Sequence, residues 1–389
     1  MAEHSHKIVE GLNQSGILPY EVVWKPPLIT NALIRKTFEE ANMDETCAGV
    51  ITWMHTFSPA KSWIIGLQEY RNPHADRKKG CCRTLGRSCC SRKDCILDAY
   101  PVNEIAQSVD AVSEADVNTL VEEYYDRYEI LLEGRDEKEF RKHVAVQAQI
   151  EIGFERFLEE KNYQAIVTHF GDLGALKQLP GLAIQRLMEK GYGFGAEGDW
   201  KVAAMVRLMK IMTGDLKNPK GTSMLEDYTY NLVKGKEGIL EAHMLEICPS
   251  IAEGPISIKC NPLSMGDRED PARLVFTSKE GPGIATSLID LGNRFRLIIN
   301  DVECKKVERP MPKLPVATNF WTPKPDMYTG AEAWILVGGA HHTAFTYDLT
   351  AEQMGDWAAA MGIEAVYIDK DTKIRDFKRD LMLGEVFYK

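Results

Sequence analysis

One stretch, residues 191–230, constrains the fold of this chain more than any other. It opens with a glycine-rich approach to Glu197, continues through a long apolar segment at residues 200–212, and reaches a second acid, Glu226. The apolar segment has few polar positions on any side, which predicts a buried helix rather than an amphipathic surface helix. Asp199 precedes it and is a favourable N-cap residue. The stretch therefore predicts two carboxylates held at the two ends of one buried unit.

Two later segments supply histidines. Residues 242–248 alternate as a strand does, which predicts that His243 shares one face with Leu245 and Ile247. Residues 333–337 form an apolar run that we expect to be a strand, broken by two glycines ahead of a histidine pair. Both segments would bring imidazoles to the end of a strand.

Together with His243, one member of the histidine pair His341 and His342 completes a set of two carboxylates and two imidazoles. Such a set suits an octahedral divalent ion of the manganese, cobalt or magnesium kind. No short local ligand motif accompanies these residues, so their spacing alone does not identify a metal site. The ordinary alternative for each glutamate is a solvated loop charge.

Four longer blocks of sequence contain these acids and histidines. They read Gly-Phe-Gly-Ala-Glu-Gly-Asp-Trp-Lys from Gly193, Gly-Thr-Ser-Met-Leu-Glu-Asp-Tyr-Thr-Tyr from Gly221, His-Met-Leu-Glu-Ile-Cys-Pro-Ser-Ile-Ala from His243, and Glu-Ala-Trp-Ile-Leu-Val-Gly-Gly-Ala-His-His-Thr from Glu332. In sequence and in order, the blocks resemble the signature blocks of bacterial L-arabinose isomerases. The resemblance covers about residues 9–67 and again from about residue 99 to the end. It fails between about residues 71 and 97, and the family's first strand is missing.

The resemblance implies an α/β fold. We expect two Rossmann-like or flavodoxin-like α/β domains, the first one incomplete, followed by a mainly β C-terminal domain. Residues 1–70 would be a remnant of the first domain, residues 98–220 the central domain and residues 221–389 the C-terminal domain. The residue pattern agrees, because helices and strands alternate before residue 220 and β-branched runs broken by Gly, Pro and Asp follow it. Within the first domain, residues 20–25 are expected to form a strand.

Capping residues predict where three later helices begin. Ser113 is expected to open a helix that runs to about Leu132, and a second long helix is expected at residues 136–161. Thr350 and Gln353 form a capping box for a third helix, which is followed by an expected strand at residues 364–368.

Residues 71–97 differ from the sequence on either side. The segment is strongly basic and holds five of the nine cysteines, without apolar periodicity. Its cysteine spacing lacks the paired knuckles of a zinc site, and a disulfide module would require a secretory signal that the sequence does not show. We interpret the segment as the scar of a deletion or of sequence assembly, disordered or poorly packed, where the family carries a longer segment.

The resemblance also implies roles for single residues. The implied ligands of a Mn²⁺ ion, with Co²⁺ or Mg²⁺ as alternatives, are Glu197, Glu226, His243 and His342. The two glutamates would also form the acid/base pair.

Three further residues are implied to contact the sugar: Phe57, Phe170 and His341. Each has a simpler alternative, which is a packing role for the two aromatic rings and a turn-filling role for the histidine.

The implied activity is that of a metal-dependent aldose–ketose isomerase, which converts L-arabinose to L-ribulose through a cis-enediol. Two alternatives stay open: a degenerate or truncated non-catalytic paralogue, and a related isomerase, such as a fucose isomerase-like enzyme, that acts on another sugar. The formal charge of −10 and the pI near 5.5 argue against nucleic-acid and anionic membrane partners. Neither a signal peptide nor a transmembrane run is apparent, so we expect a cytoplasmic protein. The family further implies a homo-oligomer, a trimer or hexamer.

Overall fold

The computed structural model describes residues 2–18, 20–50, 97–171, 173–263, 268–308 and 311–388. The chain divides into two compact units, Met1–Ser91 and Arg92–Lys389. Phe57 and the cysteine-rich segment lie outside the described residues, so the expectations placed on them stay predictions.

Two helices make up the described part of the first unit: α1 (Ala2–Ser15) and α2 (Asn31–Met43). The strand expected at residues 20–25 is wrong, because this segment is irregular. The side chain of Asn13 accepts a hydrogen bond from the Val22 N–H at 2.7 Å and donates one to the Val22 carbonyl at 3.0 Å. A side chain of α1 therefore satisfies backbone groups that a neighbouring strand would otherwise pair.

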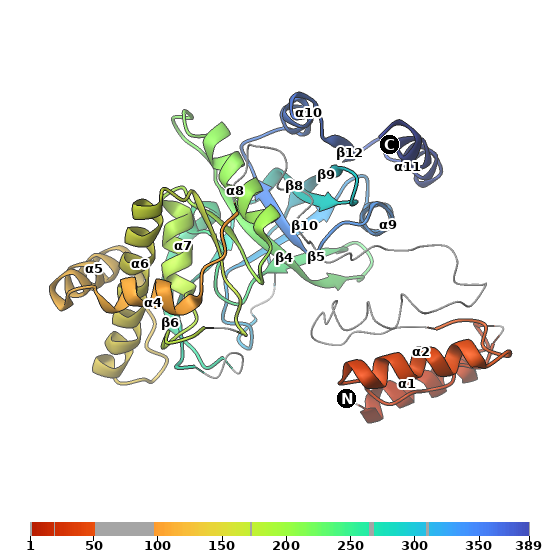
Figure 1. The fold of residues 1–389 in the computed structure, drawn as a ribbon, viewed down its shortest axis with the longest axis horizontal. Helices are drawn as coiled ribbons and strands as arrows, with labels where there is room; N and C mark the ends of the chain where they lie inside the picture. The colour runs from red at the N-terminus through yellow and green to blue at the C-terminus, as the bar shows by residue number, and fades with distance from the viewer. Residues whose placement is uncertain are drawn as a thin grey trace. The chain divides into compact units, whose positions relative to one another are not determined.

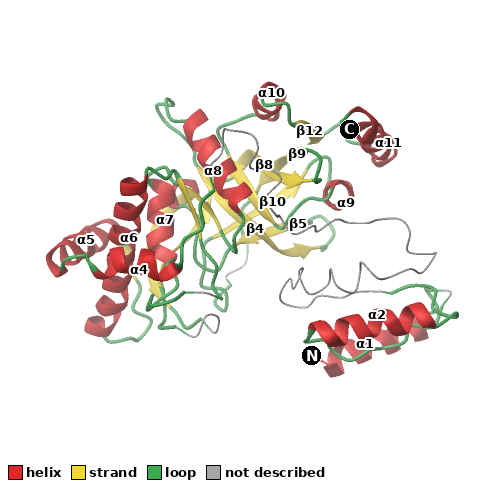
Figure 2. Ribbon diagram, viewed as in Figure 1, coloured by secondary structure: helices red, strands yellow, loops and turns green. Residues whose placement is uncertain are grey.

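The second unit begins with a helical layer (Figures 1 and 2). Its helices are α4 (Val102–Asp110), α5 (Glu114–Arg127), α6 (Glu137–Lys161) and α7 (Gly181–Glu189). The side chains of Ser113 and Asp136 cap the N-termini of α5 and α6. These caps confirm the predicted helix starts, although α5 ends at Arg127 and so is shorter than its sequence suggested.

Two short parallel strands connect this layer to the apolar helix predicted at residues 200–212. They are β2 (Ala165–Val167) and β3 (Gly193–Gly195), and α8 (Trp200–Met212) follows β3. The bounds of α8 match the predicted apolar helix, and none of its residues from Trp200 to Lys210 is exposed. Asp199 caps it by accepting a hydrogen bond from the Val202 N–H at 3.2 Å.

A ten-stranded mixed sheet forms the rest of the unit, in the order β1-β6-β7-β10-β5-β4-β11-β8-β9-β12. The strands are β1 (Glu129–Ile130), β4 (Thr222–Asn231), β5 (Gly238–Ala242), β6 (Ala252–Cys260), β7 (Ala272–Ser278), β8 (Gly281–Asp290), β9 (Phe295–Cys304), β10 (Thr318–Pro323), β11 (His342–Thr346) and β12 (Glu364–Ile368). A 3₁₀ turn, η2 (Pro249–Ile251), precedes β6. This large sheet, with helices packed against it, confirms the α/β class.

Different helices cover the two faces of the sheet. On one face, α8 and α10 (Ala351–Ala360) pack on buried residues that include Met224 and Ala344. On the other face, α9 (Met327–Val337) and α11 (Ile374–Phe387) pack on Ile298. Because side chains alternate along a strand, neighbouring residues of β4 face different helices.

Helix α9 corrects the strand expected at residues 333–337. Asp326 caps the helix by accepting hydrogen bonds from the Tyr328 and Thr329 N–H groups, and Gly338 ends it in the left-handed region at φ 88°. Its buried positions recur every three or four residues, at Met327, Gly330, Ala333 and Val337. The apolar run was therefore part of a helical period that began before it.

The region after α9 agrees better with the sequence. The predicted Thr350–Gln353 capping box is present on α10, and β12 has the predicted bounds. None of the helices in the described ranges is long and apolar enough to span a membrane.

Candidate metal centre

Strand pairing brings three of the predicted ligands together. In the ladder between β11 and β4, His342 lies directly opposite Glu226, and in the ladder between β4 and β5, Glu226 lies opposite Ala242. His243 follows Ala242 at the end of β5. Ligand atoms of Glu226, His243 and His342 all lie within 4.8 Å of one another.

Glu197 joins this cluster from a different part of the chain, the loop before α8. It lies between β3 and α8, and its backbone adopts the left-handed conformation at φ 55°, which is uncommon for a residue with a side chain. Its carboxylate forms a second group with His341 and His342, again within 4.8 Å. The two groups share His342, so the four predicted ligands and His341 are neighbours.

His342 has the most distinctive environment of these residues. Its side chain is buried, and Nε2 has no hydrogen-bond partner among the described residues. Burial, and then the neighbouring His341 and His243, lower the pKa of His342 to about 2, so the imidazole is neutral. A neutral ring with an unpartnered buried nitrogen is suited to binding a cation.

His243 is held by an acid that the sequence analysis did not single out. Its Nδ1 is hydrogen bonded to the Glu246 carboxylate, which also accepts a hydrogen bond from the Leu245 N–H at 3.2 Å. Burial alone would lower the pKa of His243, but Glu246 raises it to about 9. The contact fixes the ring, with Nε2 3.8 Å from Glu226 Oε2. Glu246 lies three residues after His243, a spacing that the family block contains but that no general rule marks.

This contact also corrects the strand expected at residues 242–248. The β4–β5 ladder ends at Ala242, and the residues beyond it are irregular up to the turn η2. Leu245 and Ile247 are buried as expected, but Glu246 between them is 5% exposed, so the segment has no alternation of inward and outward residues. The inward turn of Glu246 toward His243 replaces strand pairing here.

Glu226 is a half-buried acid among other acids. Burial raises the pKa of Glu226 to about 7, with Glu197 adding to the rise and His243 opposing it. A carboxyl group with a pKa near neutrality can both take and return a proton at physiological pH. These properties make Glu226 a candidate for general acid–base chemistry.

The two remaining predicted residues differ in position. His341 is exposed at the rim, with Nε2 3.8 Å from Glu226 Oε1. Phe170 is half-buried and stacks on His169 with 4.9 Å between ring centroids. It follows β2 as Glu197 follows β3, and ends of parallel strands share an edge. The Gly198 N–H donates to the Thr168 carbonyl at 3.2 Å, which joins the two loops.

A second unpredicted acid lies beside the cluster. Asp199, identified from sequence only as a helix cap, has Oδ2 4.0 Å from His342 Nδ1. One carboxylate therefore holds the start of α8 and faces the candidate metal ligand. Its position directly before the apolar helix was the only signal in the sequence.

Protein-family models match most of this chain. Residues 1–82, 91–215 and 221–364 match family models described as the N-terminal, central and C-terminal domains of L-arabinose isomerase. The N-terminal match extends to residue 82, past residue 71, where the resemblance was expected to fail.

Curated relatives cover nearly the whole chain. An L-arabinose isomerase from Geobacillus stearothermophilus is 42% identical over 470 aligned positions, which include 100% of this chain and 94% of the relative. An L-arabinose isomerase 1 from Bacillus licheniformis is 43% identical with the same coverage, and an L-arabinose isomerase from Thermotoga sp. is 40% identical over 99% of this chain and 93% of the relative. The 470 positions exceed the 389 residues of this chain by 81, so the relatives have internal residues without a counterpart here. The chain belongs to the L-arabinose isomerase family.

Proposed function

We propose that this chain is an aldose–ketose isomerase that converts L-arabinose to L-ribulose with the help of a divalent metal ion. The ion would be held by Glu197, Glu226, His243 and His342. The observation that carries the proposal is the pair of ligand groups that share His342, whose buried Nε2 has no partner among the described residues.

The donor atoms fit such an ion. Two carboxylates and two imidazoles combine hard oxygen ligands with borderline nitrogen ligands, as manganese and cobalt accept. Glu246 orients the ring of His243 from behind, as outer-shell carboxylates do for metal-binding histidines. We propose Mn²⁺ as the working ion, with Co²⁺ and Mg²⁺ as alternatives.

The reaction moves a proton between C1 and C2 of the sugar. When bound, the ion would polarise the carbonyl and acidify the neighbouring hydroxyl. Glu226 and Glu197, whose carboxylates face the same space, would form the pair that takes the proton from one carbon and returns it to the other. His341, exposed at the rim, would contact a sugar hydroxyl, and Phe170 and Phe57 would contact the sugar frame.

We further propose that the protein works in the cytoplasm and as a homo-oligomer, a trimer or hexamer. The similarity to the curated relatives over almost their whole length supports this proposal. Size-exclusion chromatography with light scattering tests the proposed oligomer directly. A monomer at micromolar concentration would contradict it.

A coupled assay of ketose formation tests the proposed activity. Protein stripped with a chelator should be inactive, and addition of Mn²⁺ should restore conversion of L-arabinose. The matched control is Glu197→Gln, which removes a base and keeps the shape of the side chain. Protein that binds Mn²⁺ but forms no ketose would favour the non-catalytic paralogue, in line with the internal residues that this chain lacks. Faster turnover of another aldose would favour the related isomerase.

A further inference from the structure

Arg273, on β7, is a buried arginine without a carboxylate partner. Its side chain is 1% exposed, and no carboxylate in the described part of the chain lies within ion-pair distance of it. Nη1 donates to the Met244 carbonyl at 3.2 Å, Nη2 donates to the Asn261 carbonyl at 2.7 Å, and Nε has no partner among the described residues. Burial lowers the pKa of Arg273 to about 10, so the guanidinium is still charged at neutral pH.

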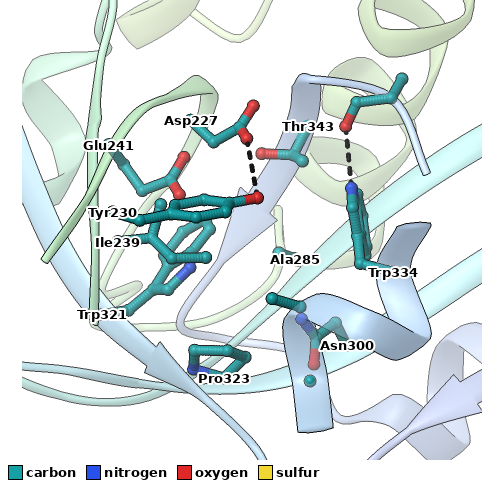
Figure 3. Close-up of a pocket in the computed structure, with 13 residues that line it drawn as sticks. Asp227, Tyr230, Ile239, Glu241, Ala285, Asn300, Trp321, Pro323, Trp334 and Thr343 are labelled. Atoms are coloured by element: carbon teal, nitrogen blue, oxygen red, sulfur yellow. Dashed lines mark hydrogen bonds between the residues drawn. The ribbon is translucent and has the colours of Figure 1, made fainter. Parts of the chain in front are cut away.

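Two unpartnered acids of the same sheet show why this arginine is unusual. Asp227 and Glu241 lie opposite each other in the ladder between β4 and β5, beside the ring of Tyr230 in a small cavity between α9 and the sheet (Figure 3). Burial raises the pKa of both acids, that of Asp227 to about 7, so each can become neutral by taking up a proton. An arginine cannot be neutralised in this way at physiological pH. The cost of burying Arg273 is therefore offset by the groups that it binds.

The first of these groups leads to the candidate metal centre. The Met244 carbonyl belongs to the peptide group that joins Met244 to Leu245, and the N–H of this peptide group donates to the Glu246 carboxylate at 3.2 Å. Glu246 is in turn hydrogen bonded to Nδ1 of His243. One peptide group therefore connects the guanidinium of Arg273 to the ring of His243, with Glu246 between them.

The backbone beside His243 has few other contacts that hold it. The β4–β5 ladder ends at Ala242, and the residues that follow are irregular up to η2. The far end of this segment is fixed separately, because Gln185 of α7 donates to the Ile247 carbonyl at 2.9 Å. Within residues 243–246, Arg273 supplies the one hydrogen bond to the backbone that comes from a described residue outside the segment.

The second group fixes the position of the guanidinium. Asn261 follows β6, and its Nδ2 donates to the Glu133 carboxylate at 2.9 Å, so it is held from another direction. Two carbonyls from different segments bind two nitrogens of one rigid, planar fork. The shape of the arginine side chain is therefore used, as well as its charge.

We propose that Arg273 is a positioning residue for the candidate metal centre: it fixes the peptide group after Met244, and with it the turn in which Glu246 orients the ring of His243. The inference rests on the proposed function, because His243 is a proposed ligand. Carboxylates that orient metal-binding histidines affect metal affinity although they do not touch the ion. Arg273 acts one contact further out, through Glu246.

Calorimetric titration of the folded protein with Mn²⁺ tests the proposal. Arg273→Met removes both donors and should raise the Kd for Mn²⁺ about 10–100-fold. Arg273→Lys keeps the charge but lacks the fork, so it should recover only part of the affinity. The matched control is Arg296→Met, which removes another buried arginine of the sheet, one that binds Glu364 and Glu385. This control should lower Tm and leave the Kd for Mn²⁺ unchanged.

Hydrogen exchange of the metal-free protein gives a second readout, which depends neither on activity nor on the ion. The amides of residues 243–248 should exchange faster in Arg273→Met than in wild type, and at the wild-type rate in Arg296→Met. Arg273→Lys gives the same comparison if Arg273→Met does not fold. Wild-type protein that binds no Mn²⁺ would contradict the proposed function, and hydrogen exchange alone would then decide the role of Arg273. Exchange at the wild-type rate in Arg273→Met, or an unchanged Kd for Mn²⁺ in that variant, would overturn the proposal.

Discussion

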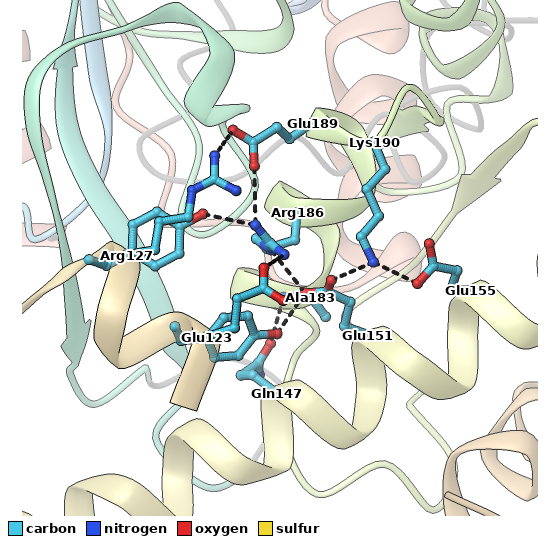
Figure 4. A network of polar contacts seen from close by, with 11 residues as sticks. Glu123, Arg127, Gln147, Glu151, Glu155, Ala183, Arg186, Glu189 and Lys190 are labelled. Atoms are coloured by element: carbon cyan, nitrogen blue, oxygen red, sulfur yellow. Dashed lines mark hydrogen bonds and ion pairs between the residues drawn. The ribbon is translucent and has the colours of Figure 1, made fainter. Parts of the chain in front are cut away.

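Two buried glutamates of this protein differ in the counter-charges that surround them. Glu151 on α6 and Glu241 on β5 are each 0% exposed. Around Glu151, Lys190 Nζ lies at 2.8 Å, Arg186 Nε at 3.5 Å, and the Tyr124 hydroxyl donates a hydrogen bond at 2.6 Å (Figure 4). Around Glu241, no described residue supplies a cation or a donor. Neighbouring residues supply the counter-charges of Glu151, whereas burial raises the pKa of Glu241 well above its ordinary value and so favours its neutral form.

The candidate metal centre belongs to the second kind. Glu197 and Glu226 face three histidines, one of them neutral, and neither glutamate forms an ion pair with a described lysine or arginine. Buried charged groups that have no counter-charge do not stabilise the folded state. Substitutions should therefore separate the two sites: changes at Glu197 and Glu226 should affect binding and catalysis, and changes at Glu151 should affect stability.

The largest expected effect is on catalysis. Glu226→Gln should lower kcat about 10²–10⁴-fold, because the change removes the carboxylate that is proposed both to bind the ion and to move the proton. The unfolding temperature without metal should change little, since burial already disfavours the charged form of this residue. Steady-state assays with Mn²⁺ and thermal unfolding in chelator check the two halves. A stability loss comparable to that of a core mutation would place Glu226 with Glu151.

The second effect is on stability. Glu151→Ala should lower the free energy of unfolding by about 3–5 kcal/mol, because Arg186 and Lys190 would be left without their buried partner. Chemical denaturation measures this change. The control is Glu155→Ala, which removes the other partner of Lys190 at a more exposed position and should cost about 1 kcal/mol or less. Equal losses in both variants would refute the contrast.

The smallest effect concerns a charge that only a helix end neutralises. Asp326→Ala should cost about 1 kcal/mol, because the cap of α9 is lost. The backbone N–H of Thr329, and then its hydroxyl, lower the pKa of Asp326 below its ordinary value. A lowered pKa means that this stabilisation is present above the ordinary pKa and is lost as the pH falls through the folded value. Unfolding curves between pH 6 and pH 3 (roughly the range of carboxyl titration) should therefore converge for variant and wild type. A constant gap would contradict this reading.

Local signals explain which elements the sequence predicted. The caps at Asp136, Asp199 and Thr350 and the apolar run of α8 determine their helices within a few residues, so α6, α8 and α10 matched. The expected strand at residues 333–337 is wrong because the apolar run is the second half of a helix whose cap, Asp326, lies seven residues before the run. The expected strand at residues 242–248 failed because a side-chain contact, that of Glu246 with His243, ends the ladder.

The candidate metal centre depends on strand pairing, which sequence periodicity does not predict. Glu226 and His342 meet because β4 pairs with β11 in one register, and no local signal sets that register across more than one hundred residues. The resemblance to a family supplied the four candidate ligands, while the contact of Glu246 with His243 and the pairing of Asp227 with Glu241 required the fold. Acids whose partners lie on distant strands are the residues that the sequence alone could not interpret.

The central claim is that Glu197, Glu226, His243 and His342 together bind one divalent metal ion. Anomalous diffraction from crystals grown with Mn²⁺ tests it most directly. We predict one strong peak surrounded by the side chains of Glu197, Glu226, His243 and His342 at roughly 2–2.5 Å. A peak that excludes His342, or a cluster that stays without Mn²⁺ at saturating concentration, would contradict the claim.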